Sequence, residues 1–190
     1  MAKAEWGTKR LCPSCGARYY DLMKPLGDIV CPKCGTQFDP EAFLKTRRAR
    51  VAVVRAEFNA AITGSLERAC LAELRSAGVA DRHVDRFAVP GCFELPIMAQ
   101  RIARRGRHDV IIALGAVIRG DTYHFELVAS ECARGIMDVS LRHDVPVIFE
   151  VLAVYRRRDA LRRAGNNRMN KGIEAASAAL AVLAGLNSLK

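Results

Sequence analysis

The sequence predicts an α/β fold in which helices cover both faces of a four-stranded parallel sheet, with a small cysteine-rich module in front of it. Three observations support this prediction. From residue 51 onward, short apolar segments alternate four times with longer amphipathic ones. Residues 1 to 44 instead combine Gly, Pro and Cys with little periodicity, and the polar, basic stretch 45 to 50 separates the two parts. We therefore expect a module at 1–44, a linker at 45–50 and a main domain at 51–190.

The first half of the main domain is expected to hold two pairs of strand and helix. VAVV (51–54) is typical of a buried strand, and the amphipathic segment after it predicts a helix that ends at Gly78. VDRFAV (84–89) is the next strand, and a Pro-Gly pair closes it. ELPIMAQRIARRG (94–106) has apolar residues at helical spacing, which predicts the second helix.

The second half repeats this pattern. DVIIALGAVI (109–118) is almost continuously apolar, which is typical of a strand buried on both faces. We expect a long helix at 122–143, a fourth strand at 146–154, and helical structure at 158–186 with an interruption at 165–167. Because crossovers between parallel strands are right-handed, the helices should lie on both faces of the sheet and give three layers.

Composition and charge narrow the class of protein. With 51% hydrophobic residues, the 190-residue chain can form a large core. No segment approaches the ~18 apolar residues of a membrane span, and the start MAKAEWGTKR lacks the apolar stretch of a secretory signal, so we expect a cytoplasmic protein without membrane contact. The net charge of +10 includes arginine clusters at 45–50, 101–107 and 156–163, which we interpret as solvated helix faces and a basic linker rather than as a nucleic-acid groove.

The module at 1–44 carries the motifs CPSCG and CPKCG, which together give the spacing C-x2-C-x15-C-x2-C. Two such knuckles place four thiolates around one tetrahedral ion, and in the cytoplasm paired cysteines favour metal over disulfides. The module is too short to bury much surface, so metal binding would supply much of its folding free energy. Zinc is the expected structural ion, while rubredoxin-like iron and a reactive dithiol remain alternatives. The predicted ligands are Cys12, Cys15, Cys31 and Cys34.

Residues whose side chains could bind a ligand or take part in a reaction follow each expected strand. In parallel sheets with helices on both faces, ligands bind beyond the carboxyl ends of the strands. That rule selects Phe58-Asn59, the segments 90–94 and 116–124, and the residues from Phe149 onward. The sequence therefore predicts one ligand site along this edge of the sheet.

The segment 116–124 suggests what this site binds. Gly120-Asp121-Thr122 lies at the expected start of a helix, where unpaired backbone N–H groups and the helix dipole favour a phosphate. The alternative is that Asp121 or Thr122 only caps the helix. His124 follows in the first turn, where it is well placed to transfer protons near neutral pH, although a lone histidine is more often a surface or packing residue.

Five motifs in register make the main domain recognisable. EFN (57–59), VPGCFELP (89–96), LGAVIRGDTYHFE (114–126), VPVIFEVL (145–152) and RAGNNRMNKGIEAA (163–176) closely resemble the 6,7-dimethyl-8-ribityllumazine synthase family. The resemblance implies a flavodoxin-like three-layer α/β/α fold and a transferase of riboflavin biosynthesis. Such an enzyme condenses 5-amino-6-(D-ribitylamino)uracil with 3,4-dihydroxy-2-butanone 4-phosphate and needs no organic cofactor.

The resemblance also implies a role for individual residues. His124 is the proton-transfer residue, and Arg163 holds the phosphate together with Asp121 and Thr122. Phe58 stacks on the pyrimidine ring, although without the resemblance a core phenylalanine is the simpler interpretation. Phe149 reaches the ring from a neighbouring subunit. The remaining implied substrate-binding residues are Cys92, Phe93, Glu94, Ala116, Val117, Ile118 and Lys171; Glu94 has an alternative as a first-turn helix carboxylate and Lys171 as a plain ion pair with Glu174.

The resemblance further implies a homo-oligomer, either a pentamer or a 60-subunit shell, because sites of the family are built between adjacent subunits. Several positions depart from the family pattern. Asp121 stands where glutamate is frequent, Glu150 and Ala153 replace the usual glycine and threonine, and Met169 replaces a glycine. The alternative function is therefore a non-catalytic assembly that displays the cysteine module to a protein or nucleic-acid partner. The module itself, at residues 7–41, is similar to the FYDLN-type zinc-ribbon family.

Overall fold

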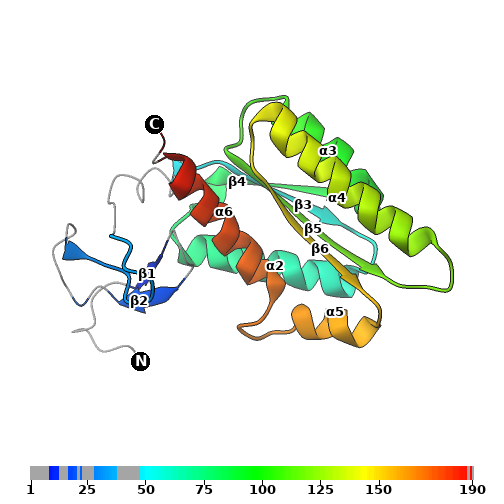
Figure 1. Cartoon of the computed structure of the whole chain (residues 1–190), viewed down its shortest axis with the longest axis horizontal. Helices are drawn as coiled ribbons and strands as arrows, with labels where there is room; N and C mark the ends of the chain where they lie inside the picture. Colours follow the sequence, from blue (N-terminus) through cyan, green and yellow to red (C-terminus); the bar gives the residue numbers. More distant parts are fainter. Residues whose placement is uncertain are drawn as a thin grey trace.

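The structure, a computed structural model of the whole chain, contains a small N-terminal module and a larger α/β domain (Figure 1). The described residues are 9–12, 17–20, 22, 28–37, 48–187 and 189. Residues 38–47 lie outside them, so the boundary expected at 45–50 stays a prediction. No helix in the described part of the chain is long and apolar enough to cross a membrane.

Four parallel strands form the sheet of the α/β domain. They are β3 (Val51–Ala56), β4 (Val84–Val89), β5 (Val110–Ile118) and β6 (Val147–Val154). The strand order is β4-β3-β5-β6, with every neighbouring pair parallel. This order, with the first and third strands of the domain in the centre, is that of a flavodoxin-like sheet. It confirms the predicted four-stranded parallel sheet.

Helices form the two outer layers. The long α2 (Ala60–Ser76) and α6 (Lys171–Asn187) lie with the short α5 (Arg157–Arg163) on one face of the sheet. On the other face, α3 (Leu95–Ala103) and α4 (His124–His143) lie side by side (Figure 1). Short 3-10 turns at Asp81–His83 and Cys92–Glu94 precede β4 and α3. The predicted three-layer architecture is confirmed.

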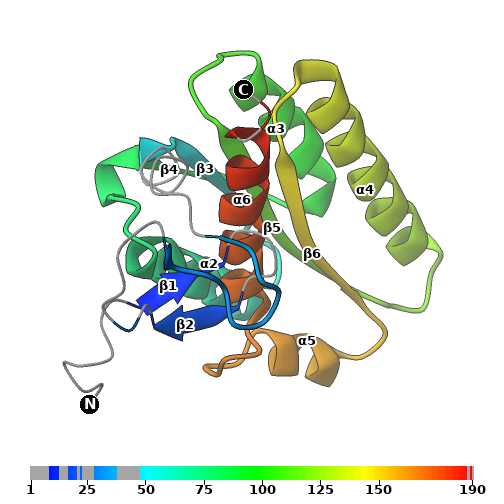
Figure 2. The same ribbon diagram turned by 60° about the vertical axis from the view of Figure 1, so that its left-hand side comes forward.

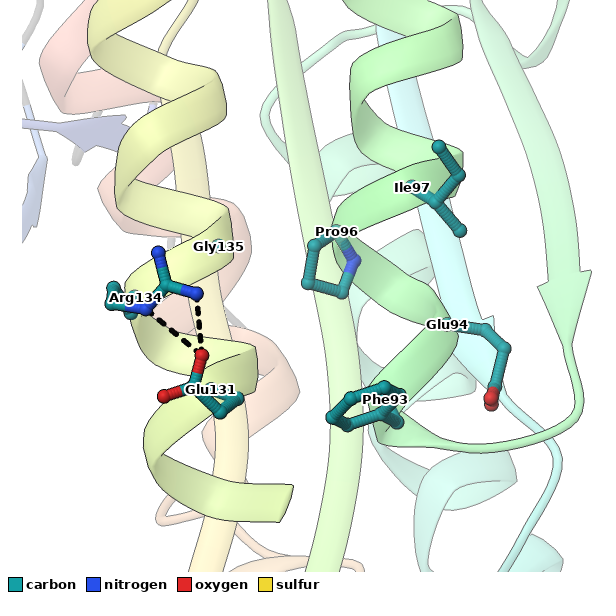
Figure 3. Close-up of a pocket in the computed structure, with 7 residues that line it drawn as sticks. All are labelled: Phe93, Glu94, Pro96, Ile97, Glu131, Arg134 and Gly135. Atoms are coloured by element: carbon teal, nitrogen blue, oxygen red, sulfur yellow. Dashed lines mark hydrogen bonds and ion pairs between the residues drawn. The ribbon is translucent and has the colours of Figure 1, made fainter. Parts of the chain in front are cut away.

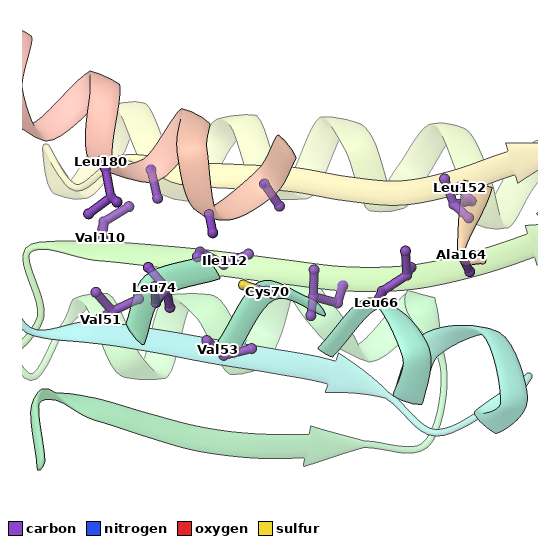
Figure 4. Close-up of a cluster of buried hydrophobic side chains, with 14 of the residues drawn as sticks. Val51, Val53, Leu66, Cys70, Leu74, Val110, Ile112, Leu152, Ala164 and Leu180 are labelled. Carbon is purple, nitrogen blue, oxygen red and sulfur yellow. The ribbon is translucent and has the colours of Figure 1, made fainter. Parts of the chain in front are cut away.

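Each face of the sheet has its own hydrophobic core. Figure 4 shows the larger core, in which side chains of α2 and α6 meet those of the central strands. The two helices approach so closely that a Cβ at Gly172 would lie 2.0 Å from the carbonyl oxygen of Leu66. On the other face, a Cβ at Gly135 of α4 would lie 2.8 Å from Pro96 of α3. In both helix pairs the close approach therefore requires glycine, which has no Cβ.

Helix ends differ from the prediction in two places. The helix expected from Thr122 begins at His124, because 121–123 form a bend and a turn and Tyr123 takes the N-cap position without a side-chain cap bond. The interpretation of Asp121 or Thr122 as a cap is therefore wrong. The helix expected to reach 106 ends at Ala103, since the chain turns to a left-handed Gly106 at φ 60°. Gly78, the predicted stop of α2, has φ 91° and follows the C-cap by one residue.

The N-terminal module is built on an antiparallel pair, β1 (Lys9–Leu11) and β2 (Arg18–Tyr20). Its core among the described residues is small and consists of Cys12, Tyr19, Ile29 and Cys31. Figures 1 and 2 both show this hairpin beside α2. The module is therefore packed against the α/β domain.

Candidate active site

The turn after β3 is fixed by Asn59. Asn59 has a left-handed backbone (φ 62°), and its side-chain amide donates a 3.0 Å hydrogen bond to the carbonyl oxygen of Ala116 at the end of β5. The N–H of Phe58 donates to Pro90 O, 2.9 Å away, in the turn after β4. Phe58 itself is 71% exposed. One turn thus connects the ends of three strands and leaves an aromatic ring on the surface. The sequence placed Asn59 at the ligand-binding edge but predicted no role for its side chain.

The turn at Cys92–Glu94 follows β4. It buries one predicted residue and leaves two facing outward. Cys92 is buried, and a Cβ on Gly115 of β5 would lie 2.6 Å from its sulfur, so the thiol fills the space that this glycine leaves. Burial raises the pKa of Cys92 to about 11. The thiol is therefore protonated at neutral pH and contributes shape, not nucleophilicity. Phe93 is exposed and Glu94 is half-buried, so these two side chains face outward.

A shallow groove begins at this turn and runs between α3 and α4. Figure 3 shows the rings of Phe93 and Pro96 on one wall, with Glu131 and Arg134 on the other. Arg134 donates to Glu131 and, at 3.2 Å, to Asp138, so its charge is balanced within α4. The groove is continuous with the predicted site through Phe93 and Glu94.

The end of β5 leads from the core to the surface. Ala116 is buried, Val117 and Ile118 are half-buried, and Asp121, Thr122 and His124 are exposed. Because α4 begins at His124, the unpaired N–H groups at its start belong to His124 and the residues just after it, not to Gly120-Asp121-Thr122. One oxygen of Glu126 in this first turn is buried and has no hydrogen-bond partner among the described residues.

Arg119 and Tyr155 connect the ends of β5 and β6. The N–H of Arg119 donates to Val154 O (2.9 Å), and its guanidinium lies 5.3 Å from the centroid of the Tyr155 ring. Tyr155 also contacts Phe125, with 6.2 Å between ring centroids. Sequence reasoning did not single out either residue, although Arg119 lies inside the motif LGAVIRGDTYHFE and Tyr155 directly follows the fourth strand.

The last predicted site residues follow β6 and belong to the other helix layer. Arg163 ends α5, and its guanidinium donates to Asp159 O at 3.2 Å. Lys171 begins α6 and forms an ion pair with Glu174. Between them Asn170, 2% exposed, donates to Gly165 O (2.9 Å) and accepts from Gly172 N (2.9 Å), which caps α6. Asn170 thereby sets where Lys171 lies, and it was not predicted.

Taken together, the predicted residues other than Phe149 lie along the carboxyl edge of the sheet but on both sides of it. His124 starts a helix that packs with α3, whereas Arg163 ends a helix that packs in the core of α2 and α6. Among the described residues, no hydrogen bond or ion pair joins His124 to Arg163. Phe149, 40% exposed, is the third residue of the edge strand β6 and pairs with Ala113, so the expectation that it lies beyond the carboxyl end of this strand is wrong.

Comparison with known proteins identifies the domain that carries this site. Residues 48–187 match the family described as 6,7-dimethyl-8-ribityllumazine synthase. The chain belongs to this family. A 6,7-dimethyl-8-ribityllumazine synthase of Xanthomonas euvesicatoria pv. vesicatoria (strain 85-10) is 47% identical over 140 residues, covering 74% of this chain and 91% of that protein. The synthase of the same name from Xylella fastidiosa (strain M12) is 45% identical over 149 residues, or 78% and 97% of the two chains.

The first 83 residues match a second family, FYDLN_acid, described as a protein of unknown function. This match extends beyond the predicted 7–41 and includes β3 and α2, which also belong to the lumazine synthase match. The two matches therefore overlap at residues 48–83.

The cysteines of the module suit a tetrahedral metal. The sulfurs of Cys12, Cys31 and Cys34 all lie within 4.8 Å of one another, and those of Cys12 and Cys34 are 3.5 Å apart. Zinc–sulfur bonds of about 2.3 Å in a tetrahedron require about 3.8 Å between sulfurs, so this spacing fits. Backbone bonds from Cys12 N to Ala17 O and from Cys31 N to Thr36 O, both 2.8 Å, close the two knuckles. The fourth predicted ligand, Cys15, lies outside the described residues.

Glu150, a departure from the lumazine synthase pattern, faces the layer of α2 and α6, because it alternates along β6 with Ile148 and Leu152, which belong to that core. Burial raises the pKa of its carboxyl to about 7; nearby Glu174 raises it as well, and Lys171 lowers it. The protonation of Glu150 therefore changes near neutral pH, beside a predicted substrate-binding residue.

Proposed function

We propose that the α/β domain catalyses the lumazine synthase reaction, condensing 5-amino-6-(D-ribitylamino)uracil with 3,4-dihydroxy-2-butanone 4-phosphate. The observation that carries this proposal is the family match over 48–187. It is supported by the position of most predicted residues, which lie at or just after the carboxyl ends of the parallel strands or in the helices that follow, whereas Phe149 lies inside β6. No group beyond the two substrates is needed to balance the reaction. The amine and ketone condense with loss of water, phosphate leaves, and the ribitylamine nitrogen closes the ring with loss of a second water.

The residues divide this work between alignment and proton transfer. Phe58 and Phe93, both exposed at neighbouring strand ends, offer faces on which a pyrimidine ring can stack. Backbone groups of Ala116, Val117 and Ile118 would align the uracil, and Glu94 would accept hydrogen bonds from ribityl hydroxyls. Exposed His124 would carry protons between the nitrogen and oxygen atoms of the intermediates.

The phosphate needs positive charge and N–H donors. The start of α4 offers unpaired N–H groups and the positive end of a helix dipole, with the Thr122 hydroxyl and Asp121 beside it. Arg163 would hold the phosphate with its forked donors, and Lys171 would add a second charge. Among the described residues, the guanidinium of Arg163 has only a carbonyl partner, Asp159 O, so it is available for an anion.

We further propose that each site is shared by two copies of the chain in a homo-oligomer. His124 and Arg163 are placed by helices on opposite sides of the sheet, and Phe149 lies exposed on an edge strand. A neighbouring copy would therefore supply Arg163, Lys171 and Phe149 to the site that contains His124 and Phe58. A pentamer is the smallest assembly we expect, and a 60-subunit shell repeats the same contact.

Mixing two inactive variants tests both proposals. His124→Ala and Arg163→Ala should each lose turnover to the fluorescent lumazine. When the two variants are unfolded and assembled together in equal amounts, about a quarter of the sites should combine an intact His124 with an intact Arg163 and recover activity, as a heterologous interface requires. If the mixture assembles but shows no turnover, the proposal of a shared site is contradicted. Tight binding of the ribitylaminouracil without turnover by the wild type would instead indicate a non-catalytic assembly.

We also propose that Cys12, Cys15, Cys31 and Cys34 hold one structural zinc ion. The support is the convergence of the three described sulfurs and the closed knuckle turns. The three cysteines of the α/β domain, Cys70, Cys92 and Cys132, are free thiols, which fits the cytoplasmic location that we propose for the chain. Metal analysis of purified protein should find one zinc per chain, and Cys31→Ser should lower that ratio. Iron in place of zinc would change the ion but not the site.

A further inference from the structure

The N-terminal module, called the ribbon below, contacts the α/β domain through a charged pair. Arg18 of β2 donates to the carboxylate of Glu73 in α2. The Glu73 side chain is 8% exposed and the Arg18 side chain 35%. Figure 2 shows the strand pair β1 and β2 beside α2. A carboxylate this well buried requires a partner, and the structure draws that partner from the ribbon.

A second carboxylate on α2 makes the contrast clear. Glu67 is also buried, and it is paired at 3.0 Å with both Arg55 of β3 and Arg86 of β4. Its partners belong to the sheet, so Glu67 is satisfied whatever the ribbon does. Glu73, two turns further along the helix, instead pairs with residue 18, outside the sheet and its helices.

The position of Arg18 depends on the cysteine knuckle. Arg18 directly follows Ala17, whose carbonyl accepts the bond from Cys12 N that closes the first knuckle. The next residue, Tyr19, belongs to the ribbon core with Cys12 and Cys31. This core is too small to order β2 without the metal. Binding of the metal would therefore also fix the side chain that neutralises Glu73.

We propose that the metal-loaded ribbon is an intramolecular clamp, in which the Arg18–Glu73 contact transmits metal binding to the stability of the α/β domain. The inference rests on the proposed zinc site. The contact lies near the carboxyl end of α2, where the chain returns to the beginning of the strands, so it is remote from the candidate active site. The FYDLN_acid match, which ends at residue 83, includes Glu73 together with Arg18. The clamp acts on folding, and turnover of the folded enzyme does not depend on it.

The test follows thermal unfolding of the full-length, zinc-loaded chain before and after chelation. Chelation should lower the Tm of the α/β domain by about 3 °C or more, the shift expected when a partly buried pair is lost from a chain of this size. Glu73→Gln keeps the shape of the side chain but removes its charge, and its Tm should respond to the chelator much less. The exchange Arg18→Glu with Glu73→Arg should restore the response.

Arg75→Gln is the matched control. Arg75 lies two residues after Glu73 on the same helix. It pairs with Asp81 at 3.1 Å, and both side chains of this pair are exposed. This variant should respond to chelation as the wild type does. Zinc content, measured on every sample, separates the two proposals. A chain that binds zinc but whose Tm ignores chelation, or a Glu73→Gln variant that responds in full, overturns the clamp alone. A chain that binds no metal overturns the zinc site and the clamp with it.

Discussion

The two ends of the parallel sheet differ in where their charged and aromatic side chains find partners. At the carboxyl end, Phe58, Phe93 and Tyr123 are 71%, 58% and 70% exposed, and His124 is exposed and forms no side-chain hydrogen bond or ion pair with a described residue. At the amino end, the Nε2–H of buried His108 donates to Asp85 at 2.7 Å. The charged groups of the amino end pair mostly within the chain, whereas the side chains of the carboxyl end are left open to a ligand or to another copy.

The amino end is held by several charged and aromatic contacts, although the buried Nδ1 of His108 has no hydrogen-bond partner among the described residues. Arg50 lies 3.6 Å from Asp85, and its backbone N–H donates to the carboxylate of Asp109 at 2.7 Å. Phe87 meets the ring of His108 edge-on, at 6.2 Å between centroids. Contacts from the end of the linker (Arg50), from β4 (Asp85) and from the residue just before β5 (Asp109) therefore meet at the amino end of the sheet. The comparison teaches that substitutions at the carboxyl end should change activity, and those at the amino end stability.

The largest effect that would sharpen this contrast is expected at Arg163. Arg163→Ala should lower kcat/KM by at least about 100-fold, because the phosphate loses a charge-assisted, forked donor. The Tm should stay close to the wild-type value. Arg162→Ala is the control, since its exposed guanidinium only reaches Asp159, 4.0 Å away. Equal losses from the two variants, measured by steady-state kinetics, would contradict the role of Arg163.

A large loss of stability is expected where α6 begins. Gly172→Ala would place a methyl group on the Leu66 carbonyl, so α2 and α6 must separate, at a cost of about 3 kcal/mol. Gly64→Ala in α2 is the control. Its new Cβ would only contact the flexible end of Arg68 at 3.5 Å, and the change should stabilise the helix by about 0.5 to 1 kcal/mol. Denaturant unfolding should give opposite signs for the two variants.

The pH dependence of stability should change at Glu150. Its folded pKa of about 7 exceeds the unfolded value of 4.5, so the folded state binds the proton more tightly and stability falls as the pH rises from 4.5 to 7. Glu150→Gln removes this loss, and its advantage over the wild type should grow across that window to the order of 2 kcal/mol at pH 8. Unfolding curves at pH 5 and pH 8 measure it. An advantage that is the same at both values would be inconsistent with the raised pKa.

The smallest effect is expected at the amino end. The hydrogen bond from His108, with the charges of His108 and Arg50, lowers the pKa of Asp85 below its usual 3.8. The ionised carboxylate therefore stabilises the fold above pH 3.8, and this contribution is lost as the pH falls through the lowered value. Asp85→Asn should cost less than about 1 kcal/mol at pH 7, since the pair is partly exposed. Turnover should be unchanged, and a loss of activity would break the contrast between the two ends.

The sequence allowed some parts of this structure to be predicted because their cause is local. The nearly continuous apolar run of β5 indicated a doubly buried strand, and Val110 to Leu114 are 0% exposed. The start of α4 was placed two residues early, because Gly120-Asp121-Thr122 has the composition of a cap but adopts a bend. A capping preference is a weak signal, and the surrounding chain can override it.

The contacts that position the site are tertiary and left little trace in the sequence. Asn59 bonds to Ala116, 57 residues away, and Ser65 donates to Ala164 O at 2.6 Å, 99 residues away. Neither pairing follows from periodicity or from a motif. Asn170 was visible as part of a motif, but its role as a buried cap depends on the loop at 165–170 that it holds together. The contact between Arg18 and Glu73 joins two modules that spacing alone treats as separate.

Because the ribbon precedes the α/β domain in the chain, its contact with α2 has a consequence for synthesis on the ribosome. Both partners, Arg18 and Glu73, emerge before β5 and β6 have been translated. Domains fold as units during synthesis, the amino-terminal one first. A ribbon that has already taken up its ion would meet α2 while the sheet is still half made, and would shield that helix from wrong partners until the remaining strands arrive.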